Sequence, residues 1–425
     1  MKIILPISFC TACLLLLLSC GSNKDNADYA TSLTFHPGEE TKIIEALLSI
    51  KDNTQVLLTQ GTYHFDNLSV AQVKNVRLQG EGFDKTILDF SSQTQGGEGV
   101  RATDVNGFVI DGMTLRESKG DLLKVNKSRN ISITNLHTVW KTSDSSNGGY
   151  AIYPVLCTNV LIENCYVQGS SDAGIYIGQS DSAIVRNCKA YKNVAGCEIE
   201  NTTNALVYDN EFYGNTGGFL VFDLPGLSKR GGNTKAYNNY VHDNNERNFA
   251  KAGSFGTSTG VGNVSPGTGI VVLSVSDVEI HNNRILNNNT NAITILSGLF
   301  TDTKALKLMN DAYFPFSRKI SIHDNMLSMG DSFPQPALVH QSGQLFVAIE
   351  KKLQAEDTSR RHERIPLILY DGSNTNVLNN GSAVNPDSIC IEQSGSNMFV
   401  NADLLNLENQ KKWHPTVDMH PFQCK

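Results

Sequence analysis

Three carboxylates and two tyrosines recur at comparable positions of a repeated segment. They are Tyr153, Tyr176, Glu198, Glu200 and Asp223. Tyrosine rings pack against the apolar faces of sugar rings, and carboxylates accept hydrogen bonds from hydroxyl groups. Closely spaced carboxylates repel each other, so they require a cation, a basic neighbour or a raised pKa. We therefore take these five residues as candidate catalytic residues for acid–base chemistry on a sugar chain.

A calcium ion is one way to relieve the repulsion between the carboxylates. Glu198, Glu200 and Asp223 offer hard oxygen ligands at staggered positions, which suit Ca²⁺. We expect calcium as a cofactor on this basis. The sequence contains no C-x-x-C or H-E-x-x-H motif and no Cys/His cluster with zinc spacing, so a transition-metal site is not expected.

Basic side chains from nearby loops are the other way to relieve the repulsion between the carboxylates. The loop after Asp223 and a long insertion between repeats, residues 246–266, would supply them. The expected substrate-binding residues are Lys229, Arg230, Arg247 and Lys251. An insertion of that size at one corner is typical of a loop that walls a groove.

These residues are positioned by a repeat of about 22 or 23 residues between positions 150 and 289. It is plainest in V160-L-I-E-N-C, A183-I-V-R-N-C, A205-L-V-Y-D-N and V278-E-I-H-N-N. A second column of short alternating strands precedes it, in G174-I-Y-I, G196-C-E-I, F219-L-V-F and G269-I-V-V. A period of this length indicates a solenoid whose coils bury their apolar faces by stacking.

The alternation within the first strands predicts which side chains face the core. The expected inward residues are Ile175 and Ile177, Cys197 and Ile199, Leu220 and Phe222, and Ile270 and Val272. The outward positions then carry Tyr176, Glu198 and Val221, and two residues later Glu200 and Asp223. All five candidate residues would lie on one exposed face within three or four coils.

A column of amides just after the second strand has a different role. Asn210, Asn239, Asn283 and Asn325 follow Cys165 and Cys188 at the same register. Side-chain amides stacked at the strand spacing of about 4.8 Å can hydrogen-bond from coil to coil. We interpret this column as structural.

In this pattern the chain resembles the right-handed parallel β-helix repeat proteins over roughly residues 55–330. That architecture is shared by pectate lyases, pectinesterases, rhamnogalacturonases and mannuronan C5-epimerases. The resemblance implies an all-β fold and a groove for an extended polysaccharide, with lyase or C5-epimerase chemistry on uronic-acid polymers as the expected activity. The D-P-H motif of the epimerases is absent, and no arginine occupies an outward first-strand position in our alignment of the repeats.

The ends of the chain indicate a lipoprotein with caps. Residues 1–19 read as a signal peptide that ends in the lipobox L17-L-S-C, so Cys20 is the expected lipidation site. Residues 20–38 would be a tether, 39–333 the solenoid with an amphipathic capping helix at its start, and 334–425 an irregular C-terminal cap. The expected location is the cell envelope, with membrane contact only through the lipid.

The net charge of the chain limits the kinds of binding partner that we expect. Without Lys2 of the signal peptide, 34 basic residues face 42 acidic ones, a net charge of −8, which argues against nucleic acid. We expect a monomer. For Cys165 and Cys188 both a disulfide and stacked thiols are open, and Cys390 and Cys424 are a second candidate pair.

Three functions fit these observations. The first is an enzyme on an extended polysaccharide, a lyase or C5-epimerase, or a hydrolase that uses two carboxylates. The second is a non-catalytic surface protein that binds glycans through the same face, and the third is a structural scaffold with no ligand.

Overall fold

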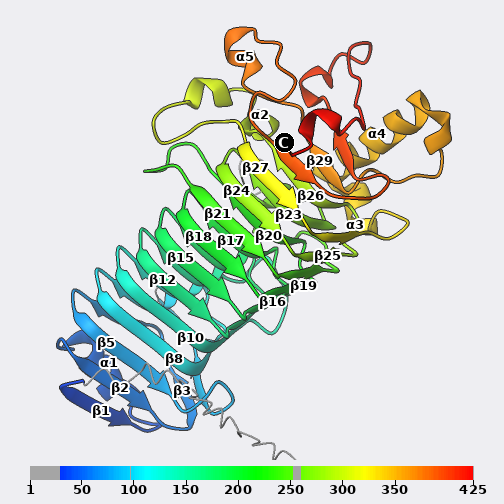
Figure 1. The fold of residues 1–425 in the computed structure, drawn as a ribbon. Helices are drawn as coiled ribbons and strands as arrows, with labels where there is room; N and C mark the ends of the chain where they lie inside the picture. Colours follow the sequence, from blue (N-terminus) through cyan, green and yellow to red (C-terminus); the bar gives the residue numbers. More distant parts are fainter. Residues whose placement is uncertain (1–28, 96, 252–259, 425) are drawn as a thin grey trace, which may run out of the picture.

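Parallel strands stack coil upon coil along most of the chain (Figure 1). The computed structural model describes residues 29–95, 97–251 and 260–424. The expected signal peptide and the lipidation site Cys20 lie outside these residues. Within them, no helix is long and apolar enough to cross a membrane.

One face of the solenoid is an eleven-stranded parallel sheet that carries the first strand of each coil. Its order follows the chain, so each strand pairs with the one a coil earlier and a coil later. The strands are β4 (Leu68–Ala71), β7 (Glu98–Thr103), β9 (Asp121–Asn126), β11 (Tyr150–Val155), β14 (Ala173–Gly178), β17 (Ala195–Glu200), β20 (Gly217–Phe222), β23 (Thr268–Leu273), β26 (Asn291–Leu296), β29 (Ile368–Tyr370) and β31 (Phe399–Asn401).

The remaining strands form two rows that close each coil. The first row comprises β1 (Thr31–Phe35), β2 (Thr54–Leu58), β5 (Lys74–Gly80), β8 (Asn106–Arg116), β10 (Arg129–Val139), β12 (Thr158–Glu163), β15 (Asp181–Arg186), β18 (Thr203–Tyr208), β21 (Gly232–Tyr237), β24 (Ser276–His281), β27 (Arg318–His323) and β30 (Cys390–Glu392). The second comprises β3 (Gly61–His64), β6 (Thr86–Asp89), β13 (Tyr166–Gln168), β16 (Lys189–Tyr191), β19 (Glu211–Tyr213), β22 (Tyr240–His242), β25 (Arg284–Leu286) and β28 (Met326–Ser328). The long strands β8 and β10 pair in both rows, which joins the rows into one sheet.

Asparagine and aspartate at one corner let each coil change direction. Asn164, Asn187, Asp209, Asn238 and Asn282 all have a φ between 54° and 56°. Asn and Asp tolerate this left-handed conformation better than other residues with a side chain. Regular coils repeat every 22 or 23 residues, as the sequence predicts.

The inside of the coils is a continuous apolar core, as the alternation predicts for most strands. Ile175, Ile177, Cys197 and Ile199 are buried in it. The prediction is wrong by one residue in β20, where Phe219 and Val221 point inward. F219-L-V-F is apolar at every position, so its alternation carries no signal for register.

The predicted amide column is confirmed. The Oδ1 of Asn239 accepts from the backbone N of Asn210 at 3.1 Å and from its Nδ2 at 2.9 Å, and Asn283 and Asn325 repeat the pattern. A second column, which sequence reasoning missed, runs through Asn193, Asn215, Asn244 and Asn288. Cys165 and Cys188 are buried free thiols at the start of the first column.

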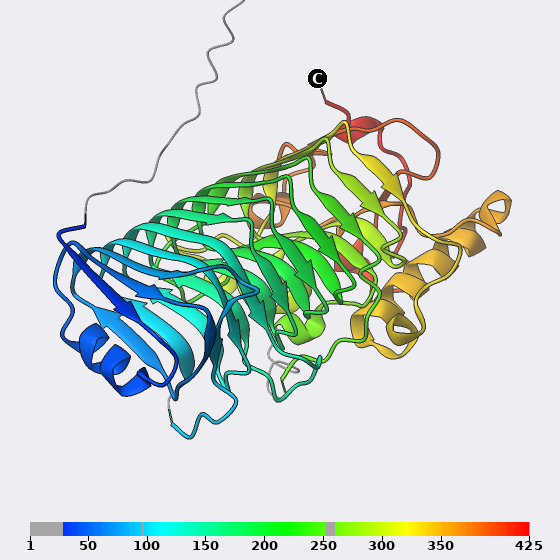
Figure 2. The same ribbon diagram turned by 90° about the horizontal axis from the view of Figure 1, so that it is seen from below.

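Both ends of the solenoid are covered. Helix α1 (Glu40–Leu48) lies across the N-terminal coil with Ile43 and Leu47 buried (Figure 2). The expected tether is wrong over β1, because this strand pairs with β2 and Phe35 packs against the core. Alternating Leu33 and Phe35 in T-S-L-T-F were the available signal.

The C-terminal region extends the solenoid as well as covering it. Strands β29 and β31 continue the eleven-stranded sheet past residue 333, and β30 continues the other sheet. Cys390 and Cys424 form a disulfide. Helices α3 (Gln335–Val339) and α4 (Gln341–Glu356) lie beside the last coils (Figure 1).

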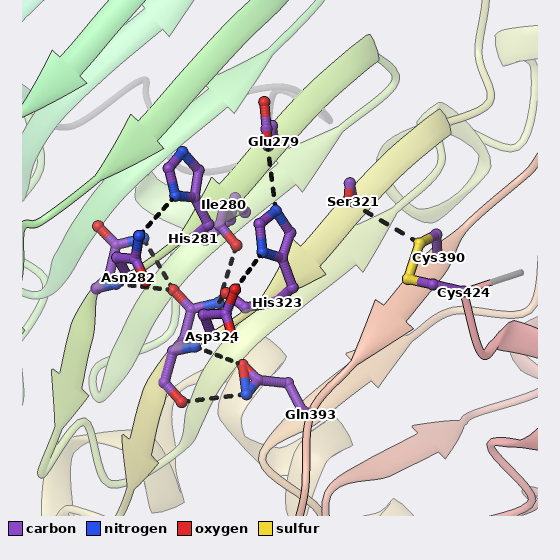
Figure 3. A network of polar contacts seen from close by, with 12 residues as sticks. Glu279, Ile280, His281, Asn282, Ser321, His323, Asp324, Cys390, Gln393 and Cys424 are labelled. Atoms are coloured by element: carbon purple, nitrogen blue, oxygen red, sulfur yellow. Dashed lines mark hydrogen bonds and ion pairs between the residues drawn. A yellow bond between two sulfur atoms is a disulfide. The ribbon is translucent and has the colours of Figure 1, made fainter.

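The outer face of the other sheet ends in a small polar network near that disulfide (Figure 3). The rings of His281 and His323 stack at 5.1 Å, and His323 bonds Glu279 at 3.2 Å and Asp324 at 2.8 Å. These two carboxylates raise the pKa of His323. The shared register of the two histidines was predicted, and both lie on the sheet that does not carry the candidate site.

Candidate functional site

The candidate tyrosines and glutamates lie together on the outer face of the eleven-stranded sheet. Tyr176 pairs with Glu198 across β14 and β17, and Gly178 pairs with Glu200. The rings of Tyr153 and Tyr176 are 4.8 Å apart. Four of the five candidate catalytic residues are therefore brought together as the repeat predicts. The face is not exposed as expected, because Tyr176, Glu198 and Glu200 are buried.

Asp223 is the exception, because of the register error in β20. Leu220 and Phe222, and not Val221 and Asp223, continue the outward columns of Glu198 and Glu200. Asp223 follows the strand and accepts two bonds from the backbone N of Gly231, at 2.8 and 3.0 Å. It closes the loop of residues 224–231 and does not line the cavity, although burial and, to a smaller extent, the charge of Glu200 raise its pKa to about 7.

Three further residues, which sequence reasoning missed, complete the cluster. Tyr150 packs between Tyr153 and Tyr176, at 4.5 and 4.6 Å. Asp172 and Asp121 lie beside it, and Tyr150 hydrogen-bonds Asp172. Tyr150 and Asp172 lie one and two residues before the assumed strand starts at Ala151 and Gly174, so the predicted outward positions did not include them.

Burial raises the pKa of every carboxyl group in this cluster. It raises the pKa of Glu200 to about 7, against a hydrogen bond from Tyr176 that lowers it. It raises the pKa of Asp172 to about 8 and that of Asp121 to about 6, where Lys124 opposes the shift. The pKa of Glu198 is also raised well above its ordinary value, because the charges of Asp172 and Glu200 add to full burial. Near neutral pH, Asp172 is thus mostly protonated, Glu200 is about half ionised and Asp121 is mostly ionised.

Glu198 has an unmet hydrogen-bonding requirement. Its side chain is buried, and its Oε1 has no partner within the described residues. A buried carboxyl oxygen without a partner is unfavourable, so it marks a place where a ligand group is expected.

A cavity of about 260 Å³ opens beside these groups. Tyr150, Asp172, Glu198 and Glu200 line one end, and Leu220, Phe222, Val271, Leu273 and Leu296 line the other. The 3₁₀ turn η1 (Val261–Asn263), helix α2 (Gly298–Thr301) and helix α4 cover it. Residues 260–265, the last part of the predicted insertion, thus supply one wall.

Hydrogen bonds hold this cover in place. His340 bonds the carbonyl oxygen of Gly262 at 3.0 Å, and Ser342 donates to that of Asn263 at 2.7 Å. Asn248 donates to the carbonyl oxygens of Val261 and Val264, at 3.0 and 2.9 Å. The cavity is therefore bounded by a fixed turn and a helix.

The four expected substrate-binding cations do not line this cavity. Lys229 donates to the carbonyl oxygen of Ser180 and to Thr203, each at 2.8 Å. Arg230 packs over the ring of Phe314, at 5.4 Å. Arg247 lines a separate surface pocket, and Lys251 is exposed.

Other cations do lie on this face, toward the N-terminus. Lys124 sits over the ring of Tyr153 at 4.7 Å and bonds Glu98 at 3.3 Å. Arg101 pairs with Lys124 in the adjacent strand, so an outward arginine is present on a first strand, contrary to our expectation. Both lie beyond the tyrosines and do not line the cavity.

The predicted calcium ligands do not converge. Asp223 is turned toward Gly231, which leaves only Glu198 and Glu200 of the expected three. In the described part of the chain, no group of three or more His, Cys, Asp or Glu side chains is placed to hold a metal ion. The residues present do not fit the calcium site.

Gly178 is required for the contact between Tyr176 and Glu200. A Cβ at position 178 would lie 2.3 Å from the Tyr176 hydroxyl oxygen. We expect Gly178→Ala to swing the ring away, which raises the pKa of Glu200 further because its hydrogen bond is lost. Titration of the Glu200 carboxyl by NMR in both proteins would check this, and an unchanged pKa would contradict it.

The raised pKa of Glu200 also predicts a pH-dependent stability. A free Glu ionises near 4.5 and Glu200 near 7, so the folded state retains a proton that the unfolded state loses. Stability from this group therefore falls as pH rises from about 4.5 to about 7, by about 3 kcal/mol. Wild type should lose that much relative to Glu200→Gln between pH 4.5 and pH 8, measured by urea unfolding. Parallel pH profiles of the two proteins would refute the shift.

Comparison with known proteins places the fold. A sequence-family profile described as "Right handed beta helix region" matches residues 137–304. No curated protein matches the chain. Among solved structures, an alginate lyase from Paenibacillus sp. str. FPU-7 is similar at 12% identity and a TM-score of 0.46, over 70% of this chain and 95% of the other.

Two further structures show a comparable likeness. The A-module of the Azotobacter vinelandii mannuronan C-5 epimerase AlgE6 has 16% identity and a TM-score of 0.44, over 69% of this chain and 85% of that one. A Thermotoga maritima exopolygalacturonase has 12% identity and a TM-score of 0.44, over 69% and 86%. The family profile over residues 137–304 and the parallel sheets, whose strands pair from coil to coil, show a right-handed parallel β-helix fold.

Proposed function

We propose that the protein binds a polysaccharide along the eleven-stranded sheet and cleaves a glycosidic bond between Glu198 and Glu200. The observation that carries this proposal is the pair itself. Two carboxyl groups on one strand line the same cavity, and their surroundings differ: Glu198 has a buried Oε1 without a partner within the described residues, and Glu200 accepts a hydrogen bond from Tyr176. Such a difference assigns the roles of acid and base to two neighbouring carboxyls.

The assignment follows from the two environments. The pKa of Glu198 is raised well above its ordinary value by burial and by the charges of Asp172 and Glu200, so it keeps its proton at neutral pH and can donate it to the leaving oxygen. Glu200, with a pKa of about 7, is partly ionised and can activate water or attack the sugar. Their Cα atoms are about 7 Å apart from the rise of a strand, and both side chains point to the same face, so both carboxyl groups can reach one sugar unit.

The aromatic groups support a sugar as the ligand. Tyr150, Tyr153 and Tyr176 form a cluster directly beside the two glutamates. Aromatic side chains of this kind pack on the apolar faces of pyranose rings. The part of the face toward the N-terminus is open, with Arg101 49% exposed, and an extended chain can approach along it.

The composition of the cavity favours hydrolysis over uronate elimination or epimerisation. Elimination requires that a cation or another donor neutralise the uronate carboxylate. No Lys or Arg is among the described residues that line the cavity, and four carboxyl groups already crowd this site. A neutral sugar avoids the added repulsion.

The test is an assay of the full-length chain against neutral and uronic-acid polysaccharides, with and without calcium. We expect new reducing ends without absorbance near 235 nm. Absorbance near 235 nm would replace hydrolysis by the lyase activity expected from the sequence. Binding without cleavage would leave the alternative of a glycan-binding protein, and neither binding nor cleavage would refute the proposal.

The lipid anchor is part of the proposed setting. The lipobox L17-L-S-C supports acylation of Cys20, which would hold the solenoid at the cell envelope, close to wall or capsule glycans. We expect the chain to incorporate labelled palmitate when expressed in a bacterial host and Cys20→Ala to abolish the label. Equal labelling of both proteins would exclude this site.

A further inference from the structure

The outward side chains of the eleven-stranded sheet change character after β17. Glu198 is followed by Leu220 and Val271 in its column, and Glu200 by Phe222 and Leu273. Outward positions on a solenoid usually meet water and are polar. Here they form an apolar surface outside the core, which also includes Leu296 and Phe346.

The region after the solenoid covers this surface and closes it toward the C-terminus. Leu369 and Val400 continue the outward column on β29 and β31, and both are fully buried. Trp413 and Ile349 pack in the same cluster. A chain that enters from the open N-terminal part of the face therefore cannot continue past the cavity.

The cavity is small, and it has a polar end and an apolar end. Its volume of about 260 Å³ lies below the roughly 300–1,000 Å³ of pockets for drug-sized ligands, so it has room for a ring or two. One end offers the unpartnered Oε1 of Glu198, and the other is walled by Leu273, Phe300 and Phe346. The matching ligand has polar hydrogens at one end and an apolar group at the other.

We infer that the cavity takes the last sugar unit of the chain together with an apolar substituent, such as an acyl or aryl group, so that cleavage proceeds from the chain end. The sugar hydroxyls face Glu198 and Glu200, and the substituent packs against Leu273 and Phe346. Burial of the substituent supplies affinity that a bare sugar lacks. The cleavage mode rests on the proposed function, whereas the binding of the substituent does not.

The binding test compares phenyl and methyl β-glycosides of glucose, galactose and mannose, titrated by ligand-observed NMR. We expect the phenyl compound to bind at least about tenfold more tightly for the preferred sugar. Val271→Phe fills the cavity and should abolish this advantage. Val339→Phe, at a position 81% exposed on α3, is the matched control and should retain it.

The possible results test the ligand of the cavity and the mode of cleavage separately. Equal binding of phenyl and methyl glycosides, or an advantage that survives Val271→Phe in a protein with an unchanged unfolding midpoint, would overturn the cavity assignment. On a polysaccharide that the protein cleaves, a single small early product supports action at the chain end, and a ladder of oligomers would overturn it. A phenyl advantage lost in Val271→Phe, but with no cleavage of any substrate, would retain the binding site and refute the proposed hydrolysis.

Discussion

Glu200→Gln is expected to lower kcat by about 10²–10⁴-fold, the usual contribution of a general acid or base. Gln preserves the shape of the side chain and can still accept from Tyr176, so substrate binding should change little. It cannot take a proton or attack a sugar. The loss should therefore appear in kcat with KM nearly unchanged.

Glu198→Gln should cause a loss of similar size, and the two losses should not add. Residues that act in one step as a unit give a double variant about as slow as the worse single variant. Glu279→Gln, on the other sheet and paired with Lys235 and His323, is the control and should keep full activity. Retention of more than about a tenth of wild-type kcat in either candidate variant would remove that carboxyl from the mechanism.

The pH profile distinguishes the two roles. In wild type, kcat/KM should rise as Glu200 ionises through its pKa of about 7 and fall again where Glu198 loses its proton. Glu200→Gln should lose the rising limb of any residual activity. A rising limb that persists in this variant would assign it to another group.

The sequence predicted the coils and the clustering of four of the five candidate residues because both follow from one period. Wherever a strand alternates between apolar and polar, as in G174-I-Y-I and G196-C-E-I, the register is determined by which face is buried. In F219-L-V-F both faces are apolar, because the C-terminal region covers the outer one. The predicted register of this strand is therefore wrong by one residue, and Phe222, not Asp223, continues the outward column of Glu200.

The cover over the cavity could not be predicted, because it depends on contacts between distant segments. Phe346 meets Leu220 and Phe222 across more than a hundred residues of chain, with no repeat to relate them. Asp172 and Tyr150 were missed for a local reason, since they precede the strand starts that the repeat suggested. The cations were misplaced because loop residues have no register: Lys229 and Arg230 satisfy neighbouring carbonyl oxygens and a ring instead.

The largest effect on stability is expected from Asn239→Ala in the amide column. The Asn239 side chain is buried and makes four hydrogen bonds: its Oδ1 accepts twice from Asn210, and its Nδ2 donates to Asn283 and to the carbonyl oxygen of Val207. Alanine leaves two donors of Asn210 and the Val207 oxygen without partners in the core. Each unsatisfied buried group costs about 1–3 kcal/mol, so we expect a loss of about 3–5 kcal/mol in the free energy of unfolding.

Asn239→Cys should be less harmful, because the column itself begins with Cys165 and Cys188, whose thiols donate weakly to carbonyl oxygens of the preceding coil. Asn409→Ala, at an exposed position after the last coils, is the control and should change stability by less than about 0.5 kcal/mol. Urea unfolding followed by circular dichroism measures all three. If Asn239→Ala were no less stable than Asn409→Ala, water would have to replace the missing side chain inside the coil, and the column would not hold the coils together.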